Sequence, residues 1–136
     1  MPNTQITVRT TRQGLYEITS EVARAVAEAA IDDGLCTVFV RHTSASLTIQ
    51  ENADPSARHD LERWLNRLVP EGDGLYTHTA EGPDDMPSHI KAILTQTSLT
   101  IPIDRGRLVL GTWQGVYLWE HRRSPHRRDV VVHVGG

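Results

Sequence analysis

Apolar and polar residues alternate along residues 4–10, and this period of two predicts a β-strand. We expect residues 15–19 to form its partner, after a turn that contains glycine. Between Ser20 and Gly34 the apolar residues recur every three or four positions, as on one face of a helix, so we predict a helix capped by Ser20 and stopped by Gly34. The chain therefore begins with two strands and a helix.

Two more strands and a longer helix are predicted in the middle of the chain. The apolar runs 35–43 and 46–52 indicate buried strands with a break between them. Asp54 followed by Pro55 is a favoured helix start, because a capping acceptor precedes a residue that needs no N–H partner. The helix that follows should bury four side chains of one face: Leu61, Trp64, Leu65 and Leu68.

From residue 98 onward the pattern is that of strands, with a hairpin turn at 104–106. Because helices and strands do not alternate strictly, we expect an α+β fold with a mostly antiparallel, β-sandwich-like core and two or three helices. The length predicts a single domain over residues 1–136. Strands that are apolar on both faces indicate a covering helix layer or a subunit interface.

Composition narrows the class of protein. Acidic residues outnumber basic ones by 17 to 14, which does not favour nucleic acid as a partner. No apolar stretch is long enough to cross a bilayer and no signal peptide is evident, so we expect a cytoplasmic protein without a membrane partner. Lys91 is the only lysine, which suggests either compositional drift or a lysine kept for a phosphate or carboxylate.

The stretch YTHTAEGPDDMPSHI, residues 76–90, combines metal-ligand and acid/base side chains. His78 and His89 are candidate ligands for a zinc-like metal, with His89 on a short helix expected from Met86 to Leu94 and buried through His89 or Ile90 with Ile93 and Leu94. A catalytic zinc usually takes three protein ligands, so a third must come from elsewhere. From the residues alone, a polar loop with helix-capping acids is the favoured reading. The nearby acids that could ligate a metal or orient its ligands are Glu81, Asp84 and Asp85.

A second candidate region is RHTSASLTIQENADP, residues 41–55. His42 ends a strand, and the hydroxyl groups and free N–H groups of the turn after it suit an anion such as phosphate. Ser44 and Ser46 are the hydroxyl residues expected to bind it. Glu51 is a candidate general base at the far end of the next strand, where Asn52 follows it.

A third region is LGTWQG, residues 110–115, with the strand after it. The flat face of Trp113 and the donor and acceptor of Gln114 suit a heteroaromatic ring, but a packed strand with a bulge is equally consistent. Glu120 is a candidate buried carboxylate in a strand of large apolar residues. The run HRRSPHRR at 121–128 indicates a solvated loop or a phosphate clamp.

Three stretches together resemble the YjbQ-like family, whose members are often labelled secondary thiamine-phosphate synthase: RHTSASLTIQENADP, EGPDDMPSHIKA and SLTIPIDRGRLVLGTWQGVYLWEHR. The resemblance covers nearly the whole chain. It implies an α+β homotrimer with sites near the subunit interfaces. The residues onto which the family pattern falls are His42, Thr43, Ser44, Ser46, Glu51, Asn52, His78, His89, Gly111, Thr112, Trp113, Gln114 and Glu120.

The resemblance implies an enzyme that joins hydroxymethylpyrimidine diphosphate to thiazole phosphate and releases pyrophosphate. We expect Glu51 and His42 to be catalytic, and His78, His89 and His42 to hold a divalent metal, zinc first and magnesium as the alternative with a diphosphate. The partner would be a small phosphorylated substrate. Two rival hypotheses are a metal-dependent hydrolase and a non-enzymatic trimeric metal- or metabolite-binding protein. The residues expected to bind substrate are Ser44, Ser46, Asn52, Thr112, Trp113, Gln114 and Glu120.

Overall fold

The computed structural model describes residues 3–136, so Met1 and Pro2 of the expected domain 1–136 lie outside the described residues. The strands are β1 (Asn3–Thr10), β2 (Gly14–Glu17), β3 (Gly34–Val40), β4 (Ala45–Glu51), β5 (Ser98–Asp104), β6 (Arg107–Leu108), β7 (Gln114–Glu120) and β8 (His126–Gly135). The helices are α1 (Thr19–Ala29), α2 (Pro55–Leu68) and α3 (Asp85–Leu94).

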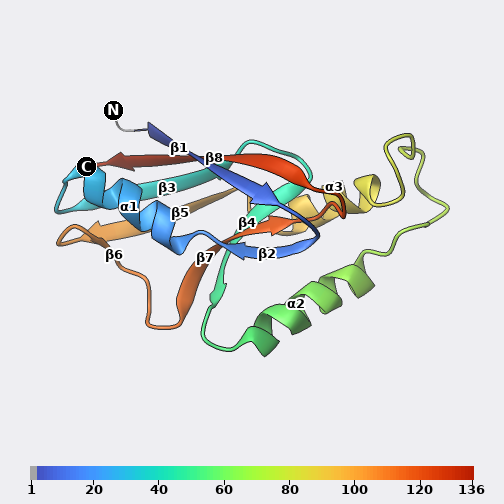
Figure 1. The fold of residues 1–136 in the computed structure, drawn as a ribbon, viewed down its shortest axis with the longest axis horizontal. Coiled ribbons are helices and arrows are strands. Elements are labelled where there is room, and N and C mark those ends of the chain that lie inside the picture. Colours follow the sequence, from blue (N-terminus) through green and yellow to red (C-terminus); the bar gives the residue numbers. More distant parts are fainter. Residues whose placement is uncertain (1–2) are drawn as a thin grey trace.

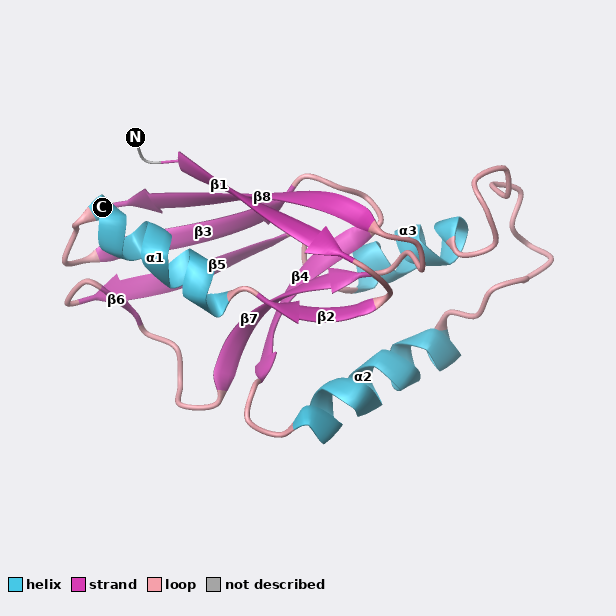
Figure 2. Ribbon diagram, viewed as in Figure 1, coloured by secondary structure: helices cyan, strands magenta, loops and turns pink. Residues whose placement is uncertain are grey.

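The strands form two antiparallel sheets (Figures 1 and 2). The larger has the order β1-β8-β3-β5-β6 and the smaller the order β2-β7-β4. This confirms the expected α+β class with a mostly antiparallel core. One expected pairing is wrong: β2 pairs with β7, whereas β1 pairs with β8, so residues 15–19 are not the partner of residues 4–10. The short connection lets the chain cross from one sheet to the other instead of closing a hairpin.

The main core lies between the two sheets and α1. Val22, Ala25 and Val26 of α1 are buried in it, as the helical spacing predicts. The helix begins at Thr19, one residue before the expected Ser20 cap, and Ile18 occupies the N-cap position without a side-chain bond. The other core residues alternate along the strands and include Ile6, Val8, Val38, Val40, Leu47, Ile101, Ile103, Val116, Leu118, Val130, Val132 and Val134.

A second, smaller core covers the other face of the small sheet. Tyr117 and Trp119 of β7 pack there with Leu65 of α2, while Val116 and Leu118 face the main core. Strand β7 is therefore buried on both faces, and α2 supplies the helix layer that such a strand requires. Asp54 caps α2 by accepting from the Ser56 N–H at 2.9 Å. The buried face of α2 is narrower than expected, because Trp64 and Leu68 remain about half exposed.

Helix α3 buries polar side chains and exposes apolar ones. Asp85, Ser88 and Lys91 are buried at a spacing of three residues, whereas Ile93 and Leu94 are exposed. The expected burial of Ile93 and Leu94 is therefore wrong, because the buried polar groups of α3 find partners in the neighbouring segments, although Ile90 of the expected face packs partly buried against the smaller core. Figure 2 shows the long loop that joins α2 to α3 at one end of the molecule. No helix within residues 3–136 is long and apolar enough to cross a membrane.

Candidate metal centre

Three potential ligands meet where α3 begins. His78 lies in the loop before α3, Asp85 is its first residue, and His89 lies one turn later. One ligand atom from each lies within 4.8 Å of the other two. The Nε2 atoms of His78 and His89 lie 2.6 and 3.2 Å from the same oxygen, Oδ2 of Asp85. Two imidazoles and one carboxylate are a donor set typical of zinc and of non-haem iron.

The backbone fixes the tautomer of His89. Its Nδ1 lies 2.9 Å from the carbonyl oxygen of Thr43, and a carbonyl can only accept, so Nδ1 carries a proton. In the neutral ring, Nε2 then carries no proton, and its lone pair points at the Asp85 carboxylate. A cation between these atoms would satisfy both lone pairs. A backbone carbonyl on the second ring nitrogen is also the usual partner of a metal-bound histidine.

Arg122 holds the carboxylate of Asp85 in place. Its NH1 donates to Oδ1 of Asp85 at 2.8 Å, and its Nε donates to Asp84 at 3.1 Å. Asp84 also accepts from the Arg123 N–H at 2.8 Å. Burial raises the pKa of Asp85, but the hydrogen bond to His78 and the charge of Arg122 lower it, so that overall it lies below the ordinary value. Asp85 is therefore an ionised carboxylate with Oδ2 turned toward the two histidines.

The centre is open on the His78 side. The side chain of Asp85 is 4% exposed, that of His89 31% and that of His78 46%. His78 also lines a cavity of about 370 Å³ between the loop and the start of α3, together with Tyr76 and Met86. A ligand in that cavity would lie beside the exposed edge of the three-residue cluster.

His42 does not complete the cluster. The third potential ligand beside His78 and His89 is Asp85, so residues 3–136 do not bring the expected set of three histidines together. Burial and the charge of Arg128 lower the pKa of His42, and its neutral ring accepts the Asp129 N–H at Nε2 over 2.8 Å. His42 thus anchors the strand end whose neighbour, Thr43, orients His89.

Glu120 is not free to bind a substrate. Its carboxylate is fully buried and accepts from Thr10 at 2.6 Å, from Arg128 at 2.7 and 2.5 Å, and from the Arg122 N–H at 3.0 Å. Thr10, Glu120 and Arg128 extend the inward-facing rows of β1, β7 and β8. Glu120 is therefore part of a buried ion pair between the sheets, and the expected substrate contact is a structural one.

The two serines expected to hold phosphate are also engaged. Ser44 accepts from Arg128 NH2 at 2.9 Å. Ser46 is buried, and its Oγ lies 2.9 Å from Nε2 of His121. Both residues lie at the start of β4 next to the metal-type cluster. Buried Ser46 offers no free hydroxyl to a ligand, whereas Ser44 accepts from Arg128 and keeps its O–H to donate.

The remaining expected site residues lie at the other end of the same ladder. Glu51 pairs with Gln114, while Ala45 at the opposite end of β4 pairs with Glu120, six positions away or roughly 20 Å. The Glu51 carboxylate accepts from the Asp54 N–H at 3.2 Å, and Gln114 accepts from the Gly111 N–H at 2.7 Å. Within one chain, these groups cannot share a ligand with His78 and His89. The residues of this separate group are Glu51, Asn52, Thr112, Trp113 and Gln114.

Two further residues complete the cluster. Asp85 is one of the acids that the sequence offers as a helix cap or as a group to ligate or orient, and its spacing of four from His89 places both on one face of α3. Arg122 lies 37 residues from Asp85, in a run that predicts a solvated loop or a phosphate clamp. Its role depends on the sheet, which places the end of β7 beside α3. No local sequence pattern reveals this proximity.

The fold and this cluster define an α+β protein with a two-histidine, one-carboxylate centre on a short helix. The chain belongs to the family described as UPF0047 protein YjbQ-like, whose profile matches residues 4–136. It is 54% identical to a UPF0047 protein of Synechocystis over 96% of this chain and 89% of the relative. It is 42% identical to the UPF0047 protein YjbQ of Escherichia coli O157:H7, over 96% and 95%.

Solved structures agree with the fold. A YjbQ/UPF0047 family protein of Clostridium acetobutylicum superimposes with a TM-score of 0.89 at 39% identity, over 97% of this chain and 99% of the other. A hypothetical protein of Aeropyrum pernix gives a TM-score of 0.90 at 28% identity, over 100% and 99%. The α+β architecture is therefore that of the family.

The comparisons overturn the expected thiamine-phosphate synthase activity. The relatives are named only as members of the UPF0047 family, and nothing in their names indicates a synthase or another transferase. The geometry agrees, because the residues assigned to the pyrimidine ring and those assigned to the metal lie at opposite ends of β4 and β7. The transferase hypothesis is withdrawn.

Proposed function

We propose that His78, Asp85 and His89 bind a divalent transition metal ion, zinc in the first place, and that the protein is a metal-dependent hydrolase. The observation that carries the proposal is the His89 ring. Its Nδ1 is committed to the Thr43 carbonyl, so its Nε2 faces Asp85 Oδ2 at 3.2 Å without a proton of its own in the neutral ring. That arrangement favours a cation in the space between the two atoms.

Each ligand has support for this role. Arg122 takes one oxygen of Asp85 and leaves the other for the ion. Two nitrogen donors disfavour magnesium, which prefers an all-oxygen set, so the magnesium alternative loses its basis here. Three protein ligands leave at least one position for water in a tetrahedral site. Zinc in such a site lowers the pKa of its water toward neutrality and so supplies a nucleophile.

The surroundings of His78 offer room and a proton acceptor for hydrolysis. The carboxylate of Glu81 lies 3.4 Å from His78 Nε2, and its side chain is 65% exposed. Glu81 replaces Glu51 as the candidate general base, because Glu51 lies at the far end of β4. The substrate would occupy the cavity beside Tyr76 and Met86.

Metal content tests the proposal. Untagged protein is purified without chelator, and zinc, iron and other metals are measured per chain by mass spectrometry. We expect near one zinc per chain in the wild type, and its loss in both His89→Ala and Asp85→Asn. His133→Ala is the matched control, since His133 is exposed on β8 and bonds to Asn3. The zinc protein is then assayed on p-nitrophenyl esters and phosphates.

Two results would contradict the proposal. Folded wild-type protein that neither carries nor takes up zinc would remove the metal centre. If the wild type binds stoichiometric zinc but hydrolyses the substrates only at a trace rate, equal to that of Glu81→Gln, the hydrolase hypothesis is wrong. The protein would then be a metal-binding protein. The small phosphorylated substrate, the homotrimer and the cytoplasmic location remain predictions. The first two are tested in the same preparations, the trimer by light scattering, and the location is tested by cell fractionation.

A further inference from the structure

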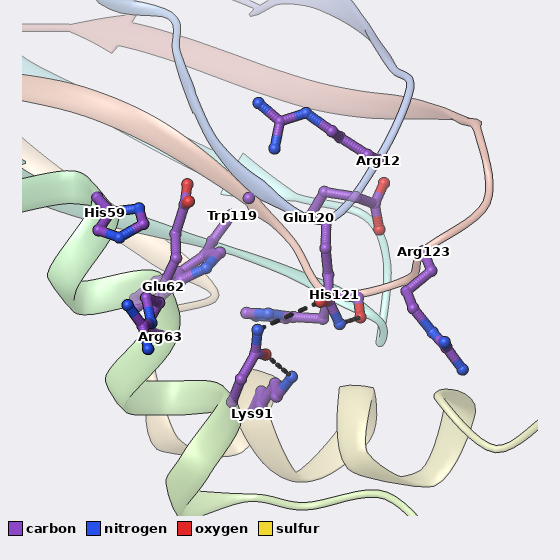
Figure 3. Close-up of a pocket in the computed structure, with 12 residues that line it drawn as sticks. Arg12, His59, Glu62, Arg63, Lys91, Trp119, Glu120, His121 and Arg123 are labelled. Carbon is purple, nitrogen blue, oxygen red and sulfur yellow. Dashed lines mark hydrogen bonds between the residues drawn. The ribbon is translucent and has the colours of Figure 1, made fainter. Parts of the chain in front are cut away.

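A separate cavity of about 450 Å³ lies between α2, α3 and the end of β7. Figure 3 shows Arg12 and Arg63 on two sides of it, with Lys91 below. Arg12 comes from the turn before β2, Arg63 from α2 and Lys91 from α3. Segments far apart in the sequence thus bring three cationic side chains to one space. None of the three metal-type ligands lines this cavity.

The cations in this cavity lack anionic partners. Within residues 3–136, no carboxylate lies within salt-bridge distance of Arg12, Arg63 or Lys91. The other charges in the wall are already paired: Arg123 with Glu71 at 2.9 Å, and Glu120 with Arg128.

Glu62 is the remaining acid in the wall, and its Oε2 accepts the Leu15 N–H at 2.7 Å. Three unpaired cations against this one carboxylate leave an excess of two positive charges. That excess matches a dianion.

Lys91 is the anchor of this arrangement. It is 4% exposed, and the single hydrogen bond of its ammonium group goes to Oδ1 of Asn66 at 2.6 Å, a neutral acceptor. An ammonium group has three donors, so two remain for a ligand. Burial lowers the pKa of Lys91, and the carboxylates of Glu71 and Asp84 offset this only in part. A buried cation without a paired charge is costly, and an anion in the cavity would remove that cost.

Part of the cavity wall is packed and apolar. Trp119 lines the cavity and is packed against Leu65 in the smaller core. Gly14 lies against Glu62, and a Cβ at this position would meet the Glu62 carboxylate at 2.8 Å. The cavity is therefore shaped by packed elements on both sides, with an indole beside the charged groups.

We infer that this cavity binds the dianionic phosphate group of a small organic phosphate, with Lys91, Arg63 and Arg12 as its ligands and Trp119 against the organic part. Guanidinium groups match phosphate oxygens through paired N–H donors, and an ammonium adds a compact charge. The inference is independent of the metal centre, because it uses none of its residues. Arg122 faces the metal-type cluster, whereas its neighbours His121 and Arg123 line the cavity.

Calorimetric titration of chelator-treated protein tests this site without the metal. The probes are phenyl phosphate, inorganic phosphate and benzoate, which separate a dianion with an aromatic part, the dianion alone and a carboxylate of similar shape. We expect binding in the order phenyl phosphate, phosphate, benzoate, weakening as salt screens the charges. Arg63→Gln should weaken phosphate binding roughly 10-fold or more, the usual loss of a charged hydrogen bond. Lys91→Met, which keeps the side-chain length, should weaken it at least as much.

Arg67→Gln is the control, because Arg67 lies one turn further along α2 and does not line this cavity. Arg63 has no side-chain hydrogen bond within residues 3–136, so its substitution tests the site without unfolding the chain. No binding of phosphate or phenyl phosphate to the wild type would overturn the inference. So would equal weakening by Arg63→Gln and Arg67→Gln, or benzoate binding as tightly as phenyl phosphate. Failure here leaves the metal centre intact, since that centre is measured by zinc content.

Discussion

Arg128 binds Glu120 through two parallel hydrogen bonds, Nε to Oε1 at 2.7 Å and NH2 to Oε2 at 2.5 Å. Glu120 is completely buried and Arg128 is 4% exposed. The pair joins β7 of the small sheet to β8 of the large one. It is a fixed charge pair at the point where the two sheets meet, next to the strand end that orients His89.

Breaking this pair should destabilise the protein strongly. We expect Glu120→Gln to lower the free energy of unfolding by about 3–5 kcal/mol, because Arg128 is left buried without a compensating charge. Urea unfolding measures the change. The double variant Glu120→Gln with Arg128→Met should lose less than the sum of the two single variants. A simple sum would show that the two side chains are not coupled.

Removal of Arg122 should weaken metal binding while all three ligands remain. In Arg122→Gln, Oδ1 of Asp85 loses its hydrogen bond from the guanidinium group. Loss of such an orienting partner typically lowers metal affinity by about 10- to 100-fold. Competition with a chromophoric chelator gives the affinity. Arg105→Gln, in the exposed hairpin turn, should match the wild type. Unchanged zinc affinity in Arg122→Gln would contradict the support that we assign to this residue.

His121 should make stability depend on pH. Burial and the charges of Lys91 and Arg128 lower the pKa of His121 to about 3, so the folded state holds the ring neutral. Its stabilising contribution is complete above the unfolded pKa near 6.5 and is lost as pH falls from there toward 3, since the unfolded chain takes up the proton first. We expect this residue to contribute roughly 1.4 kcal/mol per pH unit between pH 6 and 4.

Urea unfolding of chelator-treated protein at pH 7, 6, 5 and 4 measures this effect without metal loss. His121→Asn removes the titrating group, so its stability should fall less steeply over the same range. Parallel curves for the two proteins would show that His121 does not stay neutral.

A glycine at the start of β3 should not tolerate a side chain. A Cβ at Gly34 would lie 2.2 Å from the carbonyl oxygen of Gly135, on the neighbouring strand β8. We expect Gly34→Ala to lower the free energy of unfolding by about 1–3 kcal/mol through overpacking. Gly74→Ala is the matched control, because nothing lies within 4 Å of a Cβ there. Thermal unfolding of the two variants compares them, and equal melting temperatures would contradict the expectation.

Local patterns predicted the elements that depend on local spacing. The inward face of α1 followed from the positions of Val22 and Val26, and the start of α2 followed from Asp54 and Pro55, since spacing and capping are properties of adjacent residues. The buried face of α3 was wrong, because Asp85 and Lys91 are buried only through partners contributed by distant segments. The residues of a helix alone do not reveal that it buries charged side chains, because the partners come from other segments.

In the candidate site, too, residues close in sequence were predicted together, whereas those placed by long-range strand pairing were not. His78 and His89 were predicted and do come together, because both lie near one helix terminus. His42 and Glu51 do not join this cluster for long-range reasons. The antiparallel ladder of β4 and β7 places Glu51 at its far end, and His42 accepts the Asp129 N–H instead. Asp85 entered the centre because it shares a helix face with His89, and Arg122 entered because β7 ends there.

The position of Lys91 has a practical consequence for chemical labelling. It is the only lysine in the sequence, so a lysine-directed acylating reagent has one side-chain target. Because Lys91 is 4% exposed and lines the cationic cavity, its rate of acylation reports how often the space between α2 and α3 admits a small molecule. An occupant of the cavity would slow the reaction, and peptide mapping by mass spectrometry would measure the acylation of Lys91 apart from that of the terminal amine.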